Sequence, residues 1–210
     1  MYILTRAEPL ENCKGNIYRV HDAEVERQYL DAGYQVYERS YKLKSQNKDY
    51  IVACPEFRKR KGGAPPVVLI PDFLVPGRQF PVYIYMYAIG LYTDMPEKGQ
   101  RWAAEETRKR FGLASFAHTT LGRALKSFVR CTGGEAAAVE EEAAAAEEEA
   151  AAPDGRKGAV FPKARQTEAS RRQAASFLGG MPLWEGKRQF ADASLGLARD
   201  FFVEYQRFLL

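Results

Sequence analysis

The sequence predicts a mainly α-helical protein with one small β-hairpin, which is an α+β fold. Two runs rich in tyrosine, valine and isoleucine, GYQVYERSYKL and YIVAC, flank the polar residues SQNKD and predict the hairpin over residues 34–54. Several other segments carry apolar residues three or four positions apart, which is typical of helices. A tract of alanine and glutamate separates the C-terminal part from the rest and predicts a boundary there.

Turn and capping residues set the expected helices. HDAEVERQYLDAG reads as a short helix that Gly33 stops, and FRKRKGG after the hairpin reads as a loop. Pro81 suits the first turn of a helix over PVYIYMYAIGLYT, because a missing N–H has no consequence there. RWAAEETRKRFG reads as a helix closed by Gly112, and SFAHTTLGRALKSFV as another with Ser115 as its N-cap.

Between the hairpin and these helices lies the apolar stretch VVLIPDFLVP, residues 67–76. It is too short to span a bilayer, which needs about 20 apolar residues. Pro71 and Pro76 fix the backbone angle φ and stiffen the chain. Asp72 is expected to bond local backbone N–H groups in an Asx turn. The stretch therefore predicts a stiff strut, buried against the helices, rather than a catalytic site.

The charge of the chain is strongly polarised. Residues 135–154 hold eight acidic residues and no basic one, so the remainder carries 31 basic against 19 acidic residues. Alanine and glutamate favour helix, but clustered like charges oppose it, so residues 135–155 read as a solvated helix or a linker. A basic body with an acidic insert favours a polyanionic partner.

The tail from Gly155 begins as a basic coil and ends in an amphipathic helix. Its apolar stripe consists of Phe190, Ser194, Leu197, Phe201, Tyr205 and Phe208. We expect this stripe to pack back onto the preceding part of the chain. The alternative is a homodimer contact through residues 185–210.

Residues 103–129 read as two helices joined by a glycine-containing turn, which is typical of a helix-turn-helix. On the second helix Ala117, Leu121, Leu125 and Phe128 share one face and are expected to pack inward, whereas Gly122 lies on the outer face. The outer face suits a DNA major groove, where Arg123 can pair with guanine. The expected DNA-binding residues are His118, Thr119, Arg123 and Lys126 on this helix, with Arg108, Lys109, Arg110 and Arg130 for phosphates.

The spacing departs from a tight helix-turn-helix, because Thr120 and Leu121 come eight and nine residues after Gly112. Either the turn is longer or the second helix begins earlier. The alternative is a plain helical hairpin with a solvated basic face.

The run VACPEFRKRKGGAPPVVLIPDFLVPGRQF, followed by an aromatic helix and a helix-turn-helix, resembles a family of small bacterial proteins of unassigned function. These are related to the N-terminal regions of transposases and occur among mobile-element proteins. In that family a zinc ribbon with two C-x-x-C pairs leads into an L-P-D-x-L-V-P stretch with an aromatic four residues later. Residues 70–76 and Phe80 match that stretch, and the resemblance covers roughly residues 35–130.

The ribbon itself departs from that pattern. Phe57 stands where the partner of Cys54 is expected, and Cys13 has no second cysteine near it. Structural zinc takes four N or S ligands, and Cys13, His21 and Cys54 make three at most, so we expect no metal. The resemblance then implies a degenerate ribbon-like region over 1–66 and a helix-turn-helix region over 67–134. The composition predicts the linker over 135–155 and a C-terminal helical segment over 156–210.

Enzymatic motifs are absent from the sequence. No Walker loop, G-x-G-x-x-G or H-E-x-x-H occurs, and the two histidines belong to no recognisable triad, so we expect no catalytic residue and no cofactor. No secretory signal is visible, and three scattered cysteines suit a reducing cytoplasm. The sequence thus predicts a cytoplasmic, non-catalytic, transposase-related protein that binds duplex DNA and no membrane. The alternative is a protein-interaction module that uses the C-terminal helix.

Overall fold

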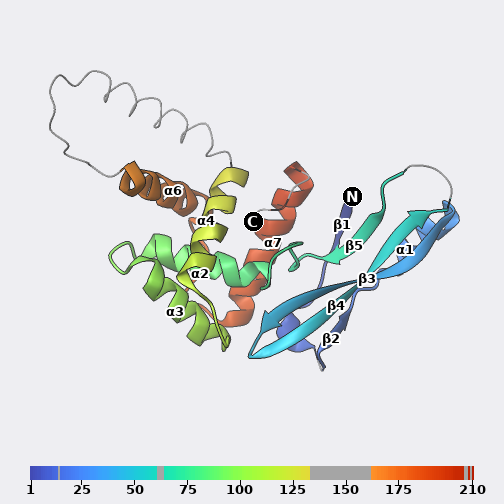
Figure 1. Cartoon of the computed structure of the whole chain (residues 1–210), viewed down its shortest axis with the longest axis horizontal. Coiled ribbons are helices and arrows are strands. Elements are labelled where there is room, and N and C mark those ends of the chain that lie inside the picture. Colours follow the sequence, from blue (N-terminus) through green and yellow to red (C-terminus); the bar gives the residue numbers. More distant parts are fainter. Residues whose placement is uncertain (14, 61–63, 133–161, 206–207, 209) are drawn as a thin grey trace, which may run out of the picture.

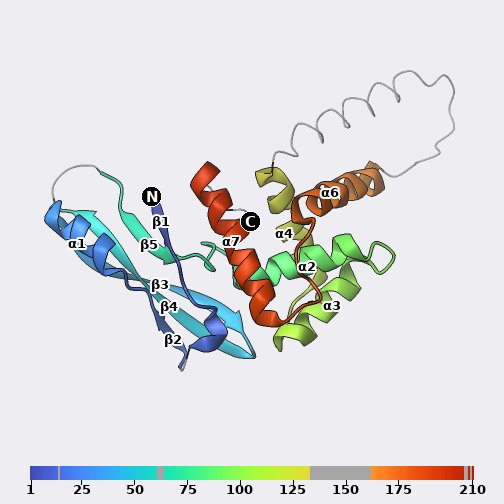
Figure 2. The same cartoon turned by 180° about the vertical axis from the view of Figure 1, so that it is seen from behind.

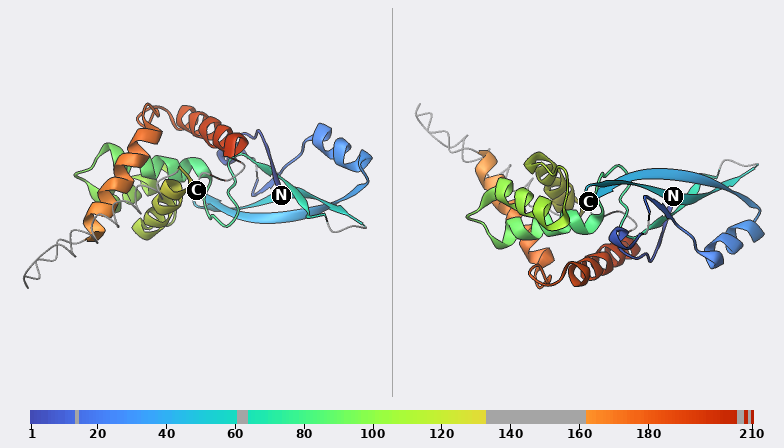
Figure 3. Two further views of the ribbon diagram at one scale, coloured as in Figure 1. Left: turned by 90° about the horizontal axis from the view of Figure 1, so that it is seen from above. Right: turned by 90° about the horizontal axis from the view of Figure 1, so that it is seen from below.

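The computed structural model describes residues 1–13, 15–60, 64–132, 162–205, 208 and 210. These residues form one mixed five-stranded sheet and six α-helices, together with a short 3-10 turn, η1 (Leu10–Asn12). The sheet and helix α1 occupy one end of an elongated molecule, and the remaining helices gather at the other end (Figures 1 and 3). The α+β class is therefore confirmed, with a larger sheet than the single hairpin that the sequence predicts.

The hairpin consists of β3 (Tyr34–Ser45) and β4 (Lys48–Lys59), which pair in antiparallel fashion along their whole length. Gln46 and Asn47 form the turn, with φ of 47° and 57°. Two consecutive left-handed residues suit a two-residue hairpin turn, because their twist matches that of the strands. The hairpin is confirmed, but the expected loop over FRKRKGG is wrong at its start. Residues 57–59 continue β4 opposite residues 34–36.

Three short strands complete the sheet on the other side of β4. β2 (Ile17–Arg19) pairs with β4 in parallel, β5 (Val67–Pro71) pairs with β4 antiparallel, and β1 (Tyr2–Thr5) pairs with β5 in parallel. Every residue of β5 is buried. The strut expected over residues 67–76 is therefore wrong for its first half. A short continuous apolar run bounded by turn residues fits a strand that is covered on both faces.

The Asx turn expected at Asp72 is also not formed. Asp72 donates its own N–H to the carbonyl oxygen of Thr5 at 3.0 Å, and the turn that follows is closed by the bond from the N–H of Leu74 to the carbonyl of Pro71. The Asp72 carboxylate faces helix α7, where its Oδ2 lies 3.5 Å from Nη1 of Arg199. The carboxylate therefore links the sheet to the C-terminal helix.

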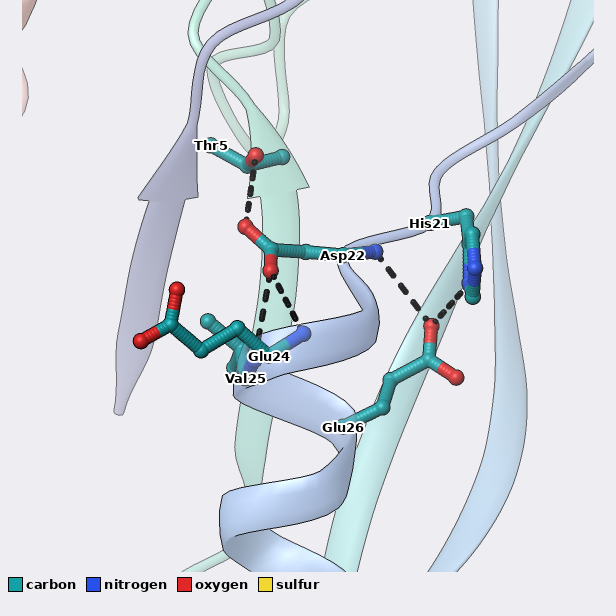
Figure 4. A network of polar contacts seen from close by, with 6 residues as sticks. All are labelled: Thr5, His21, Asp22, Glu24, Val25 and Glu26. Atoms are coloured by element: carbon teal, nitrogen blue, oxygen red, sulfur yellow. Dashed lines mark hydrogen bonds and ion pairs between the residues drawn. The ribbon is translucent and has the colours of Figure 1, made fainter.

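Helix α1 (Ala23–Asp31) begins at a well-formed N-cap, shown in Figure 4. The Asp22 carboxylate accepts from the N–H groups of Glu24 and Val25, both at 3.2 Å, and from the Thr5 hydroxyl at 3.3 Å. Glu26 in turn accepts from the Asp22 N–H at 3.4 Å and pairs with Nδ1 of His21 at 2.7 Å. The cap satisfies backbone donors that the first turn of a helix leaves unpaired.

Replacing Asp22 with alanine is expected to lower the free energy of opening α1 by about 1 kcal/mol, the usual cost of losing an N-cap. Because α1 holds no fully buried residue, the loss should be local to this helix. Native-state hydrogen exchange would show it as faster exchange of the α1 amides, with unchanged exchange in α2. Equal acceleration in both helices would contradict a purely local role.

Helix α2 (Val82–Asp94) is the centre of the helical end, with all residues from 82 to 92 buried. It is surrounded by α3 (Gly99–Phe111), α4 (His118–Cys131), α6 (Pro162–Leu178) and α7 (Lys187–Tyr205). Helix α6 lies within residues 156–210, the C-terminal segment that the sequence predicts to be helical, and its start at Pro162 limits the basic coil expected from Gly155. The segment is rich in alanine, arginine and glutamine, which favour helix. No described helix has both the length and the apolar character that crossing a membrane requires.

Helix α7 packs back onto the rest of the chain and lies between the sheet and the other helices (Figure 2). Phe190 is completely buried, with its ring edge-to-face against Tyr87 of α2 at 5.3 Å. Beyond α7, the ring of Phe208 contacts Tyr2 of β1 at 5.5 Å. The predicted stripe is confirmed at Phe190, Ser194 and Phe201, which are buried, whereas Tyr205 is half exposed. The expected linker, 135–155, lies outside the described residues, and the four region boundaries stay predictions.

Candidate nucleic-acid interface

The turn between α3 and α4 begins with a left-handed glycine. Gly112 has φ 57° and ψ 45°, and the N–H of Leu113 donates to the carbonyl of Arg108 at 2.9 Å. This is the bond pattern that closes a helix when a glycine follows it. Leu113 and Phe116 then turn into the core. The glycine stop predicted from the sequence is therefore confirmed.

Helix α4 starts later than the sequence predicts. Its N-cap is Ala117, which has no side chain that could cap, so the expected cap at Ser115 is wrong. The turn thus covers residues 112–117, longer than the three or four residues of a tight helix-turn-helix. The buried side chains of the turn explain the extra length, because two apolar residues need room to reach the core.

The two faces of α4 differ sharply in character. Leu121, Leu125 and Phe128 are buried as predicted, whereas Ala117 is exposed at the helix start, contrary to the prediction. The predicted outer residues His118, Thr119, Arg123 and Lys126 are exposed together with Arg130. Helix α4 contains no acidic residue, so Arg123, Lys126 and Arg130 on its exposed face follow one another without a carboxylate between them.

A basic residue from outside α4 adds to this outer face. Arg78, from the turn before α2, donates from Nη2 to Oγ of Ser127 at 2.6 Å, which places a further guanidinium against α4 at Ser127. No sequence signal connects Arg78 with a helix almost fifty residues away.

Gly122 of α4 is half-buried, and a Cβ there would lie 3.3 Å from Oε1 of Gln100 in α3. The α3–α4 packing therefore favours the absence of a side chain at this position.

The three basic residues at the end of α3 are engaged within the protein. Arg108 pairs with Glu105 at 2.7 Å, and Lys109 pairs with Glu106 at 2.9 Å. The hydrogen bond to Glu105 raises the pKa of Arg108, and the bond from Arg108 lowers the pKa of Glu105. Their charges are partly compensated, which weakens them as phosphate ligands.

Arg110 points toward α2 and the segment before α7. Its guanidinium lies 4.7 Å from the ring centre of Tyr87 and donates to the carbonyl oxygen of Glu185. Burial raises the pKa of Tyr87, and the nearby Arg110 opposes that rise. The structure therefore does not bring Arg110 together with the outer face of α4.

Helix α6 supports α4 from the side. Phe177 stacks edge-to-face on Phe128 at 5.2 Å, and Nε2 of Gln173 donates to Oγ1 of Thr132 at 3.0 Å. These contacts lie at the C-terminal end of α4 and on its inner face, so they leave Arg123 and Lys126 exposed. The exposed basic face is thus held on a helix that is packed from two sides.

Cys13, His21 and Cys54, which the sequence raised as zinc ligands, do not gather into one cluster. Cys54 is buried in β4, where burial raises its pKa to about 12, and the Cys13 thiol donates to the carbonyl of Ile17 at 3.4 Å. Within the described part of the chain, no three His, Cys, Asp or Glu side chains come together in a way that could hold a metal ion.

Comparison with protein-family models, with curated proteins and with solved structures gives no match. The resemblance to transposase-related proteins therefore stays an expectation from the motif at residues 70–80.

Proposed function

We propose that the protein binds duplex DNA without catalysing a reaction, and that the outer face of α4 is the contact surface. The observation that carries this proposal is the exposed row of Arg123, Lys126 and Arg130 on a helix without acidic residues. A helix of this kind fits the major groove, and positive charge along it attracts phosphates.

Two further observations support the same reading. Helices α2, α3 and α4 pack around each other, so α4 is presented on a rigid three-helix unit. Arg78 adds a cation from outside the helix, held against α4 by its hydrogen bond to Ser127. The expected relation to transposases and mobile elements, and the cytoplasmic location, belong to this proposal and rest on the sequence alone.

The rival function, a protein-interaction module built on the C-terminal helix, receives less support. Phe190, Ser194 and Phe201 of the expected stripe are buried within the chain itself. A homodimer through residues 185–210 would have to use other side chains of that segment. We therefore do not propose it.

Replacing both Arg123 and Lys126 with alanine is expected to weaken binding to a random duplex of about 30 base pairs by about 10- to 100-fold at about 100 mM salt. Two lost phosphate or base contacts should also lower the log–log salt slope by about 2. Fluorescence anisotropy across about 50–300 mM salt measures both quantities.

The matched control replaces Arg27 and Arg60, two exposed basic residues near α1, at the end of the molecule away from α4. It removes the same net charge, so we expect a small change at most. Unchanged binding in the α4 variant would contradict the proposal. An equal loss in both variants would indicate attraction to total charge rather than to α4.

A further inference from the structure

Strand β3 forms an edge of the sheet, because β4 is its one partner among the described strands. Across a two-residue turn, Ser45 and Lys48 form a bonded pair, and bonded pairs then alternate along an antiparallel ladder. The peptide groups of Val36, Glu38, Ser40 and Lys42 consequently point away from β4. Lys44 shows this alternation of inward and outward peptide groups, because its N–H points away from β4 and donates to the carbonyl of Gln79 at 2.7 Å.

This outward edge is long and open. β3 has 12 residues, against about 5–6 for a common strand, and it contains no proline. Within the described residues, the outward N–H groups of Val36, Glu38, Ser40 and Lys42 have no backbone acceptor. Open edges of this kind are templates for pairing with another strand. The contact with Gln79 closes the edge at Lys44 and leaves residues 36–42 available.

The charges along this edge fit a second copy of the same strand. If two β3 strands pair antiparallel about a two-fold axis through Ser40, Glu38 of each copy lies directly opposite Lys42 of the other. Arg39 then lies opposite Tyr41 of the second copy. Opposite charges and a cation facing an aromatic ring both stabilise cross-strand neighbours. Oε2 of Glu38 accepts a hydrogen bond from Nη1 of Arg19 at 2.9 Å, whereas Oε1 of Glu38 has no partner among the described residues.

Neighbouring registers are less favourable. An axis through Glu38, Arg39 or Lys42 would place that residue opposite its own copy, and directly opposed like charges destabilise a strand pair. An axis through Tyr41 would require the peptide group of Lys44, which Gln79 occupies. The Ser40 axis is the register that pairs opposite charges without displacing an existing bond.

We infer that β3 is a self-association surface, through which two copies of the chain join their sheets about Ser40. The pairing would continue both sheets into one and cover apolar surface beside the edge, where Val36 is 43% and Tyr37 46% exposed. The paired segment is short, so the interface is smaller than that of a permanent dimer and the association is weak. This surface is distinct from α4 and does not depend on the proposed DNA binding.

Sedimentation equilibrium of the full chain, from about 5 to 500 μM, should show a reversible monomer–dimer equilibrium, as expected for a small interface. Hydrogen exchange at the two extremes should show the amides of Glu38, Ser40 and Lys42 slowing at high concentration. The amide of Tyr41, which already bonds β4, should not change.

Ser40→Pro removes an outward N–H while leaving the β3–β4 ladder intact, so it should abolish the dimer without loss of thermal stability. Glu38→Lys and Lys42→Glu should each weaken dimerisation about tenfold or more, and the double reversal should restore it. Lys44→Glu is the matched control, because it makes the same charge change on β3 at the position that Gln79 closes.

Three results would overturn the inference. The first is a chain that stays monomeric at the highest concentration. The second is a dimer that persists in Ser40→Pro. The third is a double charge reversal that remains as weak as either single variant.

Discussion

Replacing Phe190 with alanine is expected to lower the free energy of unfolding by about 3–5 kcal/mol. The side chain is completely buried, and its ring lies edge-to-face against Tyr87 of the central helix α2. Removing it leaves a cavity between α7 and α2 that the surrounding side chains can fill only in part. Because α7 also contacts the sheet through Asp72 and Arg199, the loss should appear in one cooperative transition of the whole protein.

Urea unfolding followed by circular dichroism and by tryptophan fluorescence measures this effect. Val203→Ala is the control on the same helix, since Val203 is 66% exposed and its truncation should change stability by less than about 0.5 kcal/mol. Two separated transitions in the wild-type protein, with only one shifted by Phe190→Ala, would show instead that α7 unfolds independently of the body.

The stability of the protein is expected to fall as pH rises from about 4 to 6, because of Asp72. Burial raises the pKa of this carboxyl from 3.8 to about 6, and the Arg199 guanidinium opposes part of that rise. In this window the folded chain holds a proton that the unfolded chain has released, so raising the pH favours unfolding. A shift of about two pKa units corresponds to about 3 kcal/mol, most of it lost by pH 6 and the remainder by about pH 7.

The variant Asp72→Asn isolates this contribution from that of the other carboxyl groups. The difference in unfolding free energy, wild type minus variant, should decrease from pH 4 to pH 6 and then level off. Arg199→Met should extend the decrease to higher pH, because it removes the charge that opposes the raised pKa of Asp72. Parallel stability curves for wild type and Asp72→Asn between pH 4 and 7 would rule out Asp72 as the source.

The turns and helix ends that depend on a few adjacent residues could be predicted from the sequence. Gly112 and Gly33 are left-handed where the sequence predicts helix ends, and the turn at Gln46 and Asn47 lies within the predicted polar turn SQNKD, because turn geometry depends on a few neighbouring residues. The length of β4 was underestimated, since its end is rich in Arg and Lys. A strand there is stabilised by pairing with β3 and by the stacking of Lys59 on Tyr34 at 5.1 Å.

The strands β1, β2 and β5 could not be predicted in the same way. Each is short, and β1 and β2 take parallel partners that are far away in the sequence, at β5 and β4. An apolar run such as residues 67–71 is equally compatible with a strand or with a buried connection until its neighbours are known. The pattern of apolar residues within one short segment does not reveal which distant segment it pairs with.

At the candidate interface, the helical period correctly separated the buried Leu121, Leu125 and Phe128 from the exposed Arg123 and Lys126, whereas Gly122, expected on the outer face, is half-buried beside α3. Helical periodicity does not show which charged side chains are paired within the protein. Arg108, Lys109 and Arg110 were therefore predicted to bind DNA together with Arg123 and Lys126. In the structure the first two have Glu105 and Glu106 as neighbours, and Arg110 lies over Tyr87. Arg78 was missed because its place beside Ser127 depends on the tertiary packing.

The parallel pairing of β1 with β5 bears on how the chain folds during its synthesis. Strand β1, residues 2–5, has no partner strand until residues 68–71 have left the ribosome. The ring of Tyr2 can make its contact with the ring of Phe208 only after residue 208 has also been synthesised. Of the described strands, β1 is therefore made first and yet is among the last to be fully covered, so its apolar residues stay accessible to chaperones until then.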